Sequence, residues 1–183
     1  MQLTNIKIGI TGLPGAGKTQ ALKKVMEMLE LEGVKIGGMI TEPIVEEKHR
    51  KGFHIVDWMS KQKRVFAHLT LIQSKVAIGR YKVDLAALDE VGVPALRSAI
   101  DQADLIVIDE VGKMELESEN FVKTVKEALD AEKPLILTLF KKSRNPLLQD
   151  IRRRDDIRIL EVTSVNKNLL PFKIHKLLMG EIL

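Results

Sequence analysis

The chain has 183 residues, 45% of them hydrophobic and 30% charged, which is ordinary for a soluble globular protein that can bury a substantial core. It has no cysteine, which excludes disulfides and thiolate metal sites, and no apolar run approaches the length of a membrane span. Its net charge of +4 comes from basic and acidic residues that are interspersed along most of the chain, with exceptions at Lys61 to Arg64 and Arg152 to Arg154, so a nucleic-acid partner is not the favoured interpretation. We expect one cytoplasmic domain over residues 1–183, with no membrane partner.

A glycine-rich stretch near the start carries the clearest motif. The apolar run at residues 6–10 predicts a short buried strand, and residues 21–29 have the periodicity of a helix. Between them, eight residues fit the pattern G-x-x-x-x-G-K-[ST] at every fixed position: Gly12, Leu13, Pro14, Gly15, Ala16, Gly17, Lys18 and Thr19. A strand, this loop and a helix in succession are typical of a P-loop, so we expect these residues to bind a nucleotide.

The residue types of this loop explain its chemistry. Glycines let the backbone turn tightly and aim N–H groups at phosphate oxygens, and the next helix adds its positive N-terminal end. We expect Lys18 to reach the β- and γ-phosphates and the Thr19 hydroxyl to ligate Mg²⁺.

The region after the first helix changes character. A second strand is predicted at residues 34–41. Residues 42–69 are interpreted as an inserted antiparallel hairpin or small meander, with a polar turn at residues 46–52. This insertion could cover the nucleotide or extend an edge of the sheet, and the edge is favoured. Residues 71–82 lack periodicity and are expected to form a loop.

A second informative stretch follows a helix that Pro94 opens. Four consecutive apolar residues precede two acids in the order Leu105, Ile106, Val107, Ile108, Asp109 and Glu110. Such a run predicts a strand buried on both faces of a parallel sheet. Acidic residues at the end of this strand are typical of the Walker B element of a P-loop protein.

The two acids have distinct expected roles. Ligands of such sheets gather at the carboxyl ends of the strands, so Asp109 is expected to hold Mg²⁺ opposite Thr19. Glu110 is expected to polarise a water molecule aimed at the γ-phosphate. The alternative for Glu110 is a structural ion pair with a nearby base such as Lys113.

The rest of the chain alternates helices and short apolar strands. Ser118 is expected to cap a helix, residues 145–153 form another, and a closing helix has Pro171 in its first turn. Strands are predicted at residues 134–140 and 157–162. This alternation predicts an α/β fold with a mostly parallel sheet, right-handed crossovers and helices on both faces. No heptad stripe indicates an oligomer, so a monomer is expected.

Transfer of a phosphoryl group usually needs a further positive charge. The candidates are Arg80, Lys113 and Arg144, each in a loop beside a predicted strand or helix end. Each of them could equally be a solvated surface charge.

Four strings in chain order, GLPGAGKT, GGMITEPI, GRYKVD and DEVGKMEL, resemble the cancer-related (THEP-type) nucleoside-triphosphatases. The likeness runs from Ile6 to about Asn168, and DEVGKMEL is its most specific part. The resemblance implies a three-layer, RecA-like P-loop fold with an added strand between the two motif strands. It also implies Mg²⁺-dependent hydrolysis of ATP, GTP, CTP and UTP or TTP to diphosphates, with broad base tolerance.

The resemblance also implies nucleotide contacts, from Gly12 to Thr19 and in the second motif from Leu105 to Val111 and Gly112. A late loop, where this chain has Asn166 and Lys167, often carries an arginine after the asparagine in the family. If this loop stacks on the base, lysine stacks less well than a planar guanidinium, and base affinity is expected to be weaker.

Two other functions fit the same motifs. A P-loop kinase would move the γ-phosphate to a hydroxyl of a nucleoside, nucleotide or polynucleotide, with Glu110 as base. A nucleotide-gated binding module would hydrolyse slowly and signal to RNA, DNA or a protein partner.

Overall fold

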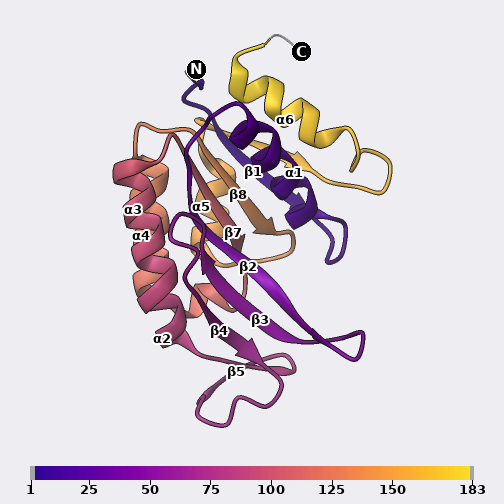
Figure 1. The fold of residues 1–183 in the computed structure, drawn as a ribbon, viewed down its shortest axis with the longest axis vertical. Coiled ribbons are helices and arrows are strands. Elements are labelled where there is room, and N and C mark those ends of the chain that lie inside the picture. Colours follow the sequence, from indigo (N-terminus) through magenta and orange to yellow (C-terminus); the bar gives the residue numbers. More distant parts are fainter. Residues whose placement is uncertain (1–2, 182–183) are drawn as a thin grey trace.

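One mixed β-sheet runs through the protein, and a computed structural model describes it over residues 3–181 (Figure 1). Its nine strands lie in the order β5-β6-β4-β3-β2-β7-β8-β1-β9. The strands are β1 Lys7–Gly12, β2 Ile36–Glu46, β3 His49–Asp57, β4 Lys63–His68, β5 Val76–Ile78, β6 Tyr81–Val83, β7 Leu105–Val111, β8 Leu135–Phe140 and β9 Ile157–Glu161.

The helices connect these strands and cover both faces of the sheet. They are α1 Lys18–Leu31, α2 Leu85–Ala87, the π-helical segment η1 Leu88–Gly92, α3 Val93–Gln102, the 3₁₀ turn η2 Glu115–Glu117, α4 Glu119–Asp130, α5 Pro146–Arg153 and α6 Leu170–Met179. No helix among residues 3–181 is both long enough and apolar enough to cross a bilayer.

The two motif strands do not touch each other. Strand β8 lies between β1, which leads into the glycine-rich loop, and β7, which ends in the acidic pair. The pairs β2–β7, β7–β8, β8–β1 and β1–β9 are all parallel. The added strand between the motif strands is therefore confirmed, and so is the three-layer α/β fold.

Two apolar cores fill the space between the sheet and the helices. On one face, Leu22 and Leu29 of α1 and Ile174 of α6 pack against the sheet. On the other face, Leu96 of α3 and Phe121 of α4 do so, together with residues of α5. The predicted stripe of α1 is confirmed, because its buried residues are Ala21, Leu22, Val25, Met26 and Leu29.

The predicted helix starts are also confirmed. Ser118 Oγ accepts a hydrogen bond of 3.0 Å from the Phe121 N–H at the start of α4. Asn145 Oδ1 accepts one of 2.9 Å from the Leu147 N–H at the start of α5. Each cap satisfies an N–H group that the first helical turn leaves unpaired.

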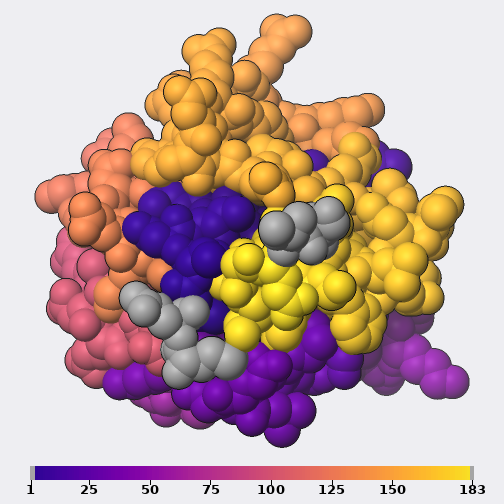
Figure 2. All heavy atoms as spheres, turned by 90° about the horizontal axis from the view of Figure 1, so that it is seen from above, coloured from indigo at the N-terminus to yellow at the C-terminus, as the bar shows by residue number. Residues whose placement is uncertain are grey.

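The first and last described segments of the chain lie side by side. The Thr4 N–H donates to the Leu178 carbonyl oxygen at 2.8 Å, so the segment before β1 lies along α6. Figure 2 looks onto these segments and shows the first residues, in indigo, beside the yellow C-terminal helix.

The antiparallel region extends the edge of the sheet, as favoured from the sequence. The strand predicted at residues 34–41 is longer than expected, because β2 continues unbroken from the parallel core into the hairpin. The turn is also shorter than predicted. It consists of Glu47 and Lys48, both with positive φ, and β3 begins at His49.

Two elements differ from the sequence expectation. The loop predicted at residues 71–82 is wrong, since β5 and β6 form a hairpin there around Gly79. Strands of three residues are too short to show alternation. The helix predicted to open at Pro94 begins earlier, at Leu85, and passes through Gly92. A Cβ at Gly92 would lie 2.8 Å from Ile55 Cδ1, so this glycine serves close packing rather than helix termination.

Candidate active site

The glycine-rich loop lies at the carboxyl end of β1 and leads directly into α1. Gly15 and Gly17 have φ values of 77° and 104°, which residues with a Cβ rarely adopt. A Cβ at Gly12 would lie 2.8 Å from Val162 Cγ1, so only glycine fits there. The N-terminus of α1 has no side-chain cap. Its first N–H groups can therefore bind an anion.

Lys18 is held in the mouth of this loop. Its Nζ lies 3.5 Å from Glu110 Oε2 and donates to the Gly12 carbonyl oxygen at 3.4 Å. The side chain is only 10% exposed. The ammonium group is thus placed between the loop backbone and the carboxylate that the second motif supplies.

Asp109 links the two motifs. The Thr19 hydroxyl donates to Asp109 Oδ2 at 2.9 Å, and the Thr138 hydroxyl donates to Oδ1 at 2.6 Å. Burial raises the pKa of Asp109 to about 6, although both hydroxyl hydrogen bonds act to lower it. The sequence did not single out Thr138, and its signal was a lone hydroxyl in the otherwise apolar strand β8.

Glu110 lies in an irregular segment of β7. The peptide bond between Asp109 and Glu110 is cis. The pairing of β7 with β8 shifts between Ile108 and Val111. Within this segment Asp109 faces Thr19 while Glu110 faces Lys18, so both acids reach the P-loop. The 28% exposure of the Glu110 side chain leaves room for water beside it.

A third carboxylate, Glu115, lies behind Glu110 and was not expected from the sequence. A Cβ at Gly112 would lie 2.7 Å from Glu110 Oε1 and 2.9 Å from Glu115 Oε2, so both side chains close around this glycine. Burial first, and then the charge of Glu110, raise the pKa of Glu115 to about 8. Glu115 is therefore mostly neutral at pH 7. The only sequence signal was its place in the DEVGKMEL string.

The buried position of Glu115 makes folding stability depend on pH. Its pKa is 4.5 in a model peptide and about 8 in the folded protein, so the unfolded chain loses this proton first as pH rises. The resulting stabilisation is complete below pH 4.5 and is lost as pH approaches 8.

We expect the variant Glu115→Gln to lack this dependence, because an amide stays neutral. Between about pH 5 and 8, its free energy of unfolding should fall less steeply than that of the wild type, by about 1.4 kcal/mol per pH unit. Urea denaturation across this range measures both slopes. Parallel curves would contradict the assignment.

The residues around Asp109 suit a magnesium ion. The oxygens of Thr19 and Asp109 lie 2.9 Å apart, and hydroxyl and carboxylate oxygens are the donors that Mg²⁺ prefers. Protein sites for Mg²⁺ usually supply one or two such groups, and phosphates and water complete the octahedron. Thr19 and Asp109 would therefore hold the ion.

The three candidate cations lie in different places. Lys113 Nζ lies 5.0 Å from the centroid of the Phe140 ring, and Phe140 pairs with Gly12, so Lys113 is beside the P-loop. Arg80 stacks on Tyr81 at the turn between β5 and β6. Six strand spacings of about 4.8 Å separate β6 from β1, about 29 Å in all, so Arg80 is not brought to the P-loop.

Arg144 follows β8 at the carboxyl ends of the parallel strands, where the P-loop also lies. Its loop, however, continues into α5 on the opposite face of the sheet from α1. Arg144 lines a pocket of ≈ 440 Å³ between the loop after β8 and α5. The pocket is lined by Lys141, Lys142, Ser143, Arg144, Gln149 and Arg152. The leucines of α5 belong to the α3–α4 core, whereas the P-loop leads into α1 on the opposite face.

The other predicted contacts divide into two groups. Leu105 to Ile108 are fully buried, so in this structure they support Asp109 and do not face a ligand. The late loop does adjoin the P-loop, because the Val162 N–H donates to the Thr11 carbonyl oxygen at 2.8 Å. Lys167 is exposed there, and the Asn166 amide binds its own loop through the Glu161 carbonyl oxygen at 2.8 Å.

Comparison with known proteins identifies the family of the chain. The family model described as NTPase matches residues 7–175. The nucleoside-triphosphatase THEP1 of Picrophilus torridus is 41% identical over 176 residues, which is 96% of this chain and 97% of that protein. THEP1 of Methanosarcina barkeri is 42% identical over 170 residues, 92% of this chain and 95% of that protein.

Two solved structures share the fold. The crystal structure of THEP1 from Aquifex aeolicus has a TM-score of 0.82 and 32% identity, covering 94% of this chain and 99% of that chain. The solution structure of a human cancer-related nucleoside triphosphatase has a TM-score of 0.80 and 30% identity, covering 97% and 100%. With a family model that spans most of its length and relatives above 40% identity, the chain belongs to the NTPase family.

Proposed function

We propose that the protein is a Mg²⁺-dependent nucleoside triphosphatase that converts NTPs to NDP and phosphate with broad base tolerance. One observation carries this proposal: Lys18, the Thr19–Asp109 pair and Glu110 converge at the carboxyl ends of β1 and β7. The named activity of the THEP1 relatives supports the same reaction class.

The residues of the site fit in-line attack by water. The loop N–H groups and Lys18 hold the β- and γ-phosphates and neutralise charge there. Glu110 orients a water molecule and accepts its proton as the water oxygen bonds to the γ-phosphorus and the bond to the β-phosphate oxygen breaks. Bound Mg²⁺ would supply further neutralisation of the phosphate oxygens.

Broad base tolerance is supported by the loop next to the P-loop. Strong discrimination between bases needs fixed polar groups that a wrong base leaves unpaired. In the late loop, the Asn166 side-chain amide donates to the Glu161 carbonyl oxygen and accepts from the Thr163 N–H. Leu13 of the P-loop and Val165 of the late loop are 54% and 89% exposed. These groups offer apolar contact that every base can use.

A kinase is the second candidate, and one observation favours it. The pocket beside Arg144 is lined by basic residues and no acid, which suits a phosphorylated acceptor. Glu110 would then activate an acceptor hydroxyl instead of water.

Phosphate release from ATP, GTP, CTP, UTP and TTP, each with Mg²⁺ and with EDTA, tests the proposal. We expect rates within about tenfold of each other and loss of activity in EDTA. Strict preference for one base would contradict base tolerance, and turnover in EDTA would contradict the metal assignment. Label from the γ-phosphate that appears on an added nucleoside or oligonucleotide, and not as free phosphate, would favour the kinase.

A further inference from the structure

The antiparallel end of the sheet concentrates positive charge. Residues 48–82 contain nine lysines and arginines and one acid, Asp57, which gives a net charge of +8. The rest of the chain has 20 lysines and arginines against 24 acids, a net charge of −4. This segment forms β3 to β6. The acids Glu42 and Glu46 of β2 and Asp84 and Glu90 border it, and Arg64 pairs with the last two, so the excess of positive charge is local to these strands. Such an asymmetry attracts a polyanion.

One face of this region is covered by helices. Ile55 of β3, Ala67 of β4 and Val83 of β6 share a core with Leu88 and Leu96 of the η1–α3 segment. Successive side chains of a strand alternate between faces, so the neighbouring positions point to the opposite face. In Figure 1, α1 and α6 lie over the upper part of the sheet, and no helix of residues 3–181 lies in front of β3 and β4.

Strand pairing identifies what the open face carries. Lys63 pairs with Val56, and His54 lies two residues before Val56 on the same face. His68 pairs with Lys82 across β4 and β6. Both lysines are exposed and both histidines are half-buried. The open face, defined by His54, Lys63, His68 and Lys82, thus presents two cations and two imidazole rings.

The two imidazoles are held in place by their surroundings. His68 Nδ1 accepts from the Thr70 N–H at 3.2 Å. Burial, and then the charge of Lys63, lower the pKa of His54. A Cβ at Gly52 would lie 2.8 Å from His68 Cδ2, so a glycine at this position makes room for the ring.

We infer that this open face binds single-stranded nucleic acid, with Lys63 and Lys82 on backbone phosphates and His54 and His68 stacked against bases. Lysines supply the phosphate contacts of such sites, and histidine is among the side chains on which unpaired bases stack. A duplex would offer its phosphates but keep its bases stacked inside, so it could use only half of this surface.

The open face continues toward the active site. Glu42 of β2 pairs with His54 and forms an ion pair of 3.3 Å with Lys23 of α1, the helix that follows the P-loop. Ile40 on the same strand pairs with Asp109. A bound strand would therefore lie against the edge of the sheet where the nucleotide phosphates are expected. The binding proposal itself does not depend on hydrolysis.

Fluorescence anisotropy of a labelled strand of about 12 nucleotides, without NTP, tests the inference. Three labelled ligands are compared: single-stranded RNA, single-stranded DNA of the same sequence and the matching duplex. We expect either single strand to bind more tightly than the duplex, with affinity falling linearly in log salt. The double variant Lys63→Ala, Lys82→Ala should bind at least about tenfold more weakly at 0.1 M salt and reduce the salt slope by about 1.4, two phosphate contacts at about 0.7 each.

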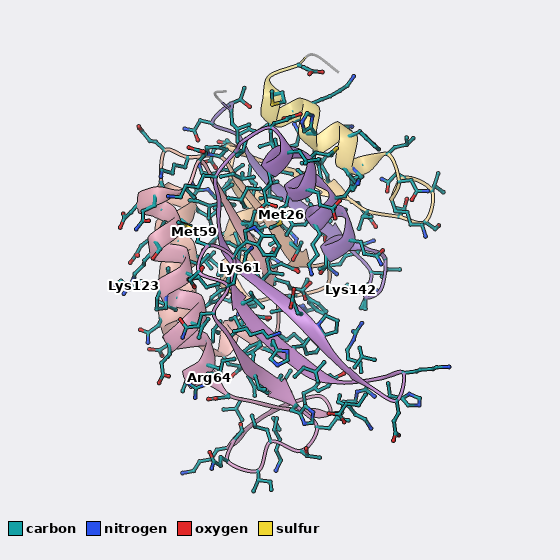
Figure 3. All side chains as sticks on the ribbon, in the orientation of Figure 1. Met26, Met59, Lys61, Arg64, Lys123 and Lys142 are labelled. Carbon is teal, nitrogen blue, oxygen red and sulfur yellow. The ribbon has the colours of Figure 1, made fainter. Side chains whose placement is uncertain are left out.

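The variant His68→Ala separates stacking from charge. It should bind about fivefold more weakly or worse, with an unchanged salt slope, because it removes an aromatic ring and neither of the two phosphate-binding lysines. The matched control is the double variant Lys123→Ala, Lys126→Ala, which changes two exposed residues of α4. Figure 3 shows Lys123 on the outer side of this helix, pointing away from the sheet. This control removes two positive charges, as the open-face double variant does, but the dependence of its affinity on log salt should keep the wild-type slope.

Unchanged basal phosphate release in all three variants confirms that they fold. Three outcomes would overturn the inference: no binding of either single strand at about 50 mM salt, preference for the duplex, or equal losses in the two double variants. A difference between RNA and DNA would show whether the sugar hydroxyl is also contacted.

Discussion

Replacing Lys18 by alanine is expected to abolish useful turnover. The Lys18 side chain is 10% exposed, and its ammonium group lies between the Gly12 carbonyl oxygen and Glu110. Its loss would remove the main phosphate-binding charge and leave Glu110 without its partner. Truncating one member of such a buried charged set costs about 3 kcal/mol or more, so kcat/KM should fall at least about a hundredfold. Phosphate release with Mg²⁺ and titration with a fluorescent NTP analogue measure both losses.

The matched control for Lys18 lies one to two turns along the same helix. Lys24 is exposed and pairs with Glu27 at 3.0 Å. Exposed pairs of this kind contribute little, so Lys24→Ala should leave both turnover and NTP affinity close to wild type. Full activity in Lys18→Ala would refute the P-loop assignment itself.

Replacing Glu110 by glutamine should separate chemistry from binding. Glutamine keeps the shape of the side chain but cannot accept a proton from water. A positioned general base typically contributes about 10²–10⁴-fold, so kcat should fall by that factor. NTP affinity should stay within a few-fold of wild type, because the phosphates are held by Lys18 and the loop. Single-turnover hydrolysis and equilibrium NTP binding give the two quantities.

Glu117→Gln is the control for this substitution. Glu117 lies in the same segment after β7 but is exposed, so the same chemical change should leave kcat unaltered. A Glu110→Gln enzyme that turns over at the wild-type rate would show that Glu110 is not the base. Loss of NTP affinity with unchanged kcat would instead assign Glu110 a binding role.

The P-loop and the acidic strand could be predicted because their signals are contiguous. A glycine-rich backbone loop is specified by the residues that form it, since glycine adopts the positive φ values found at Gly15 and Gly17 far more readily than residues with a Cβ. Four buried apolar residues before Asp109 likewise specify a central strand by themselves. The fold class and the starts of α4 and α5 followed from signals of the same local kind.

Thr138, which joins the site from a distant segment, could not be predicted. Thr138 reaches Asp109 only because β8 lies between β1 and β7. A single threonine in an apolar strand does not predict this contact. Arg80 was a reasonable candidate by sequence, yet the order of the strands puts it about 29 Å from β1. The short β5–β6 hairpin was missed because tertiary pairing, and not local periodicity, stabilises three-residue strands.

The sequence by itself predicted a nucleotide site at Gly12 to Thr19 and determined an acidic pair on a buried strand, because backbone preference and hydrophobic burial act on neighbouring residues. Only the tertiary structure decided which charges share a surface. It brought Lys18 to Glu110, enclosed Glu115 behind them and gathered His54, Lys63, His68 and Lys82 on one open face. These contacts depend on strand pairing between residues far apart in the chain, and no local pattern encodes that pairing.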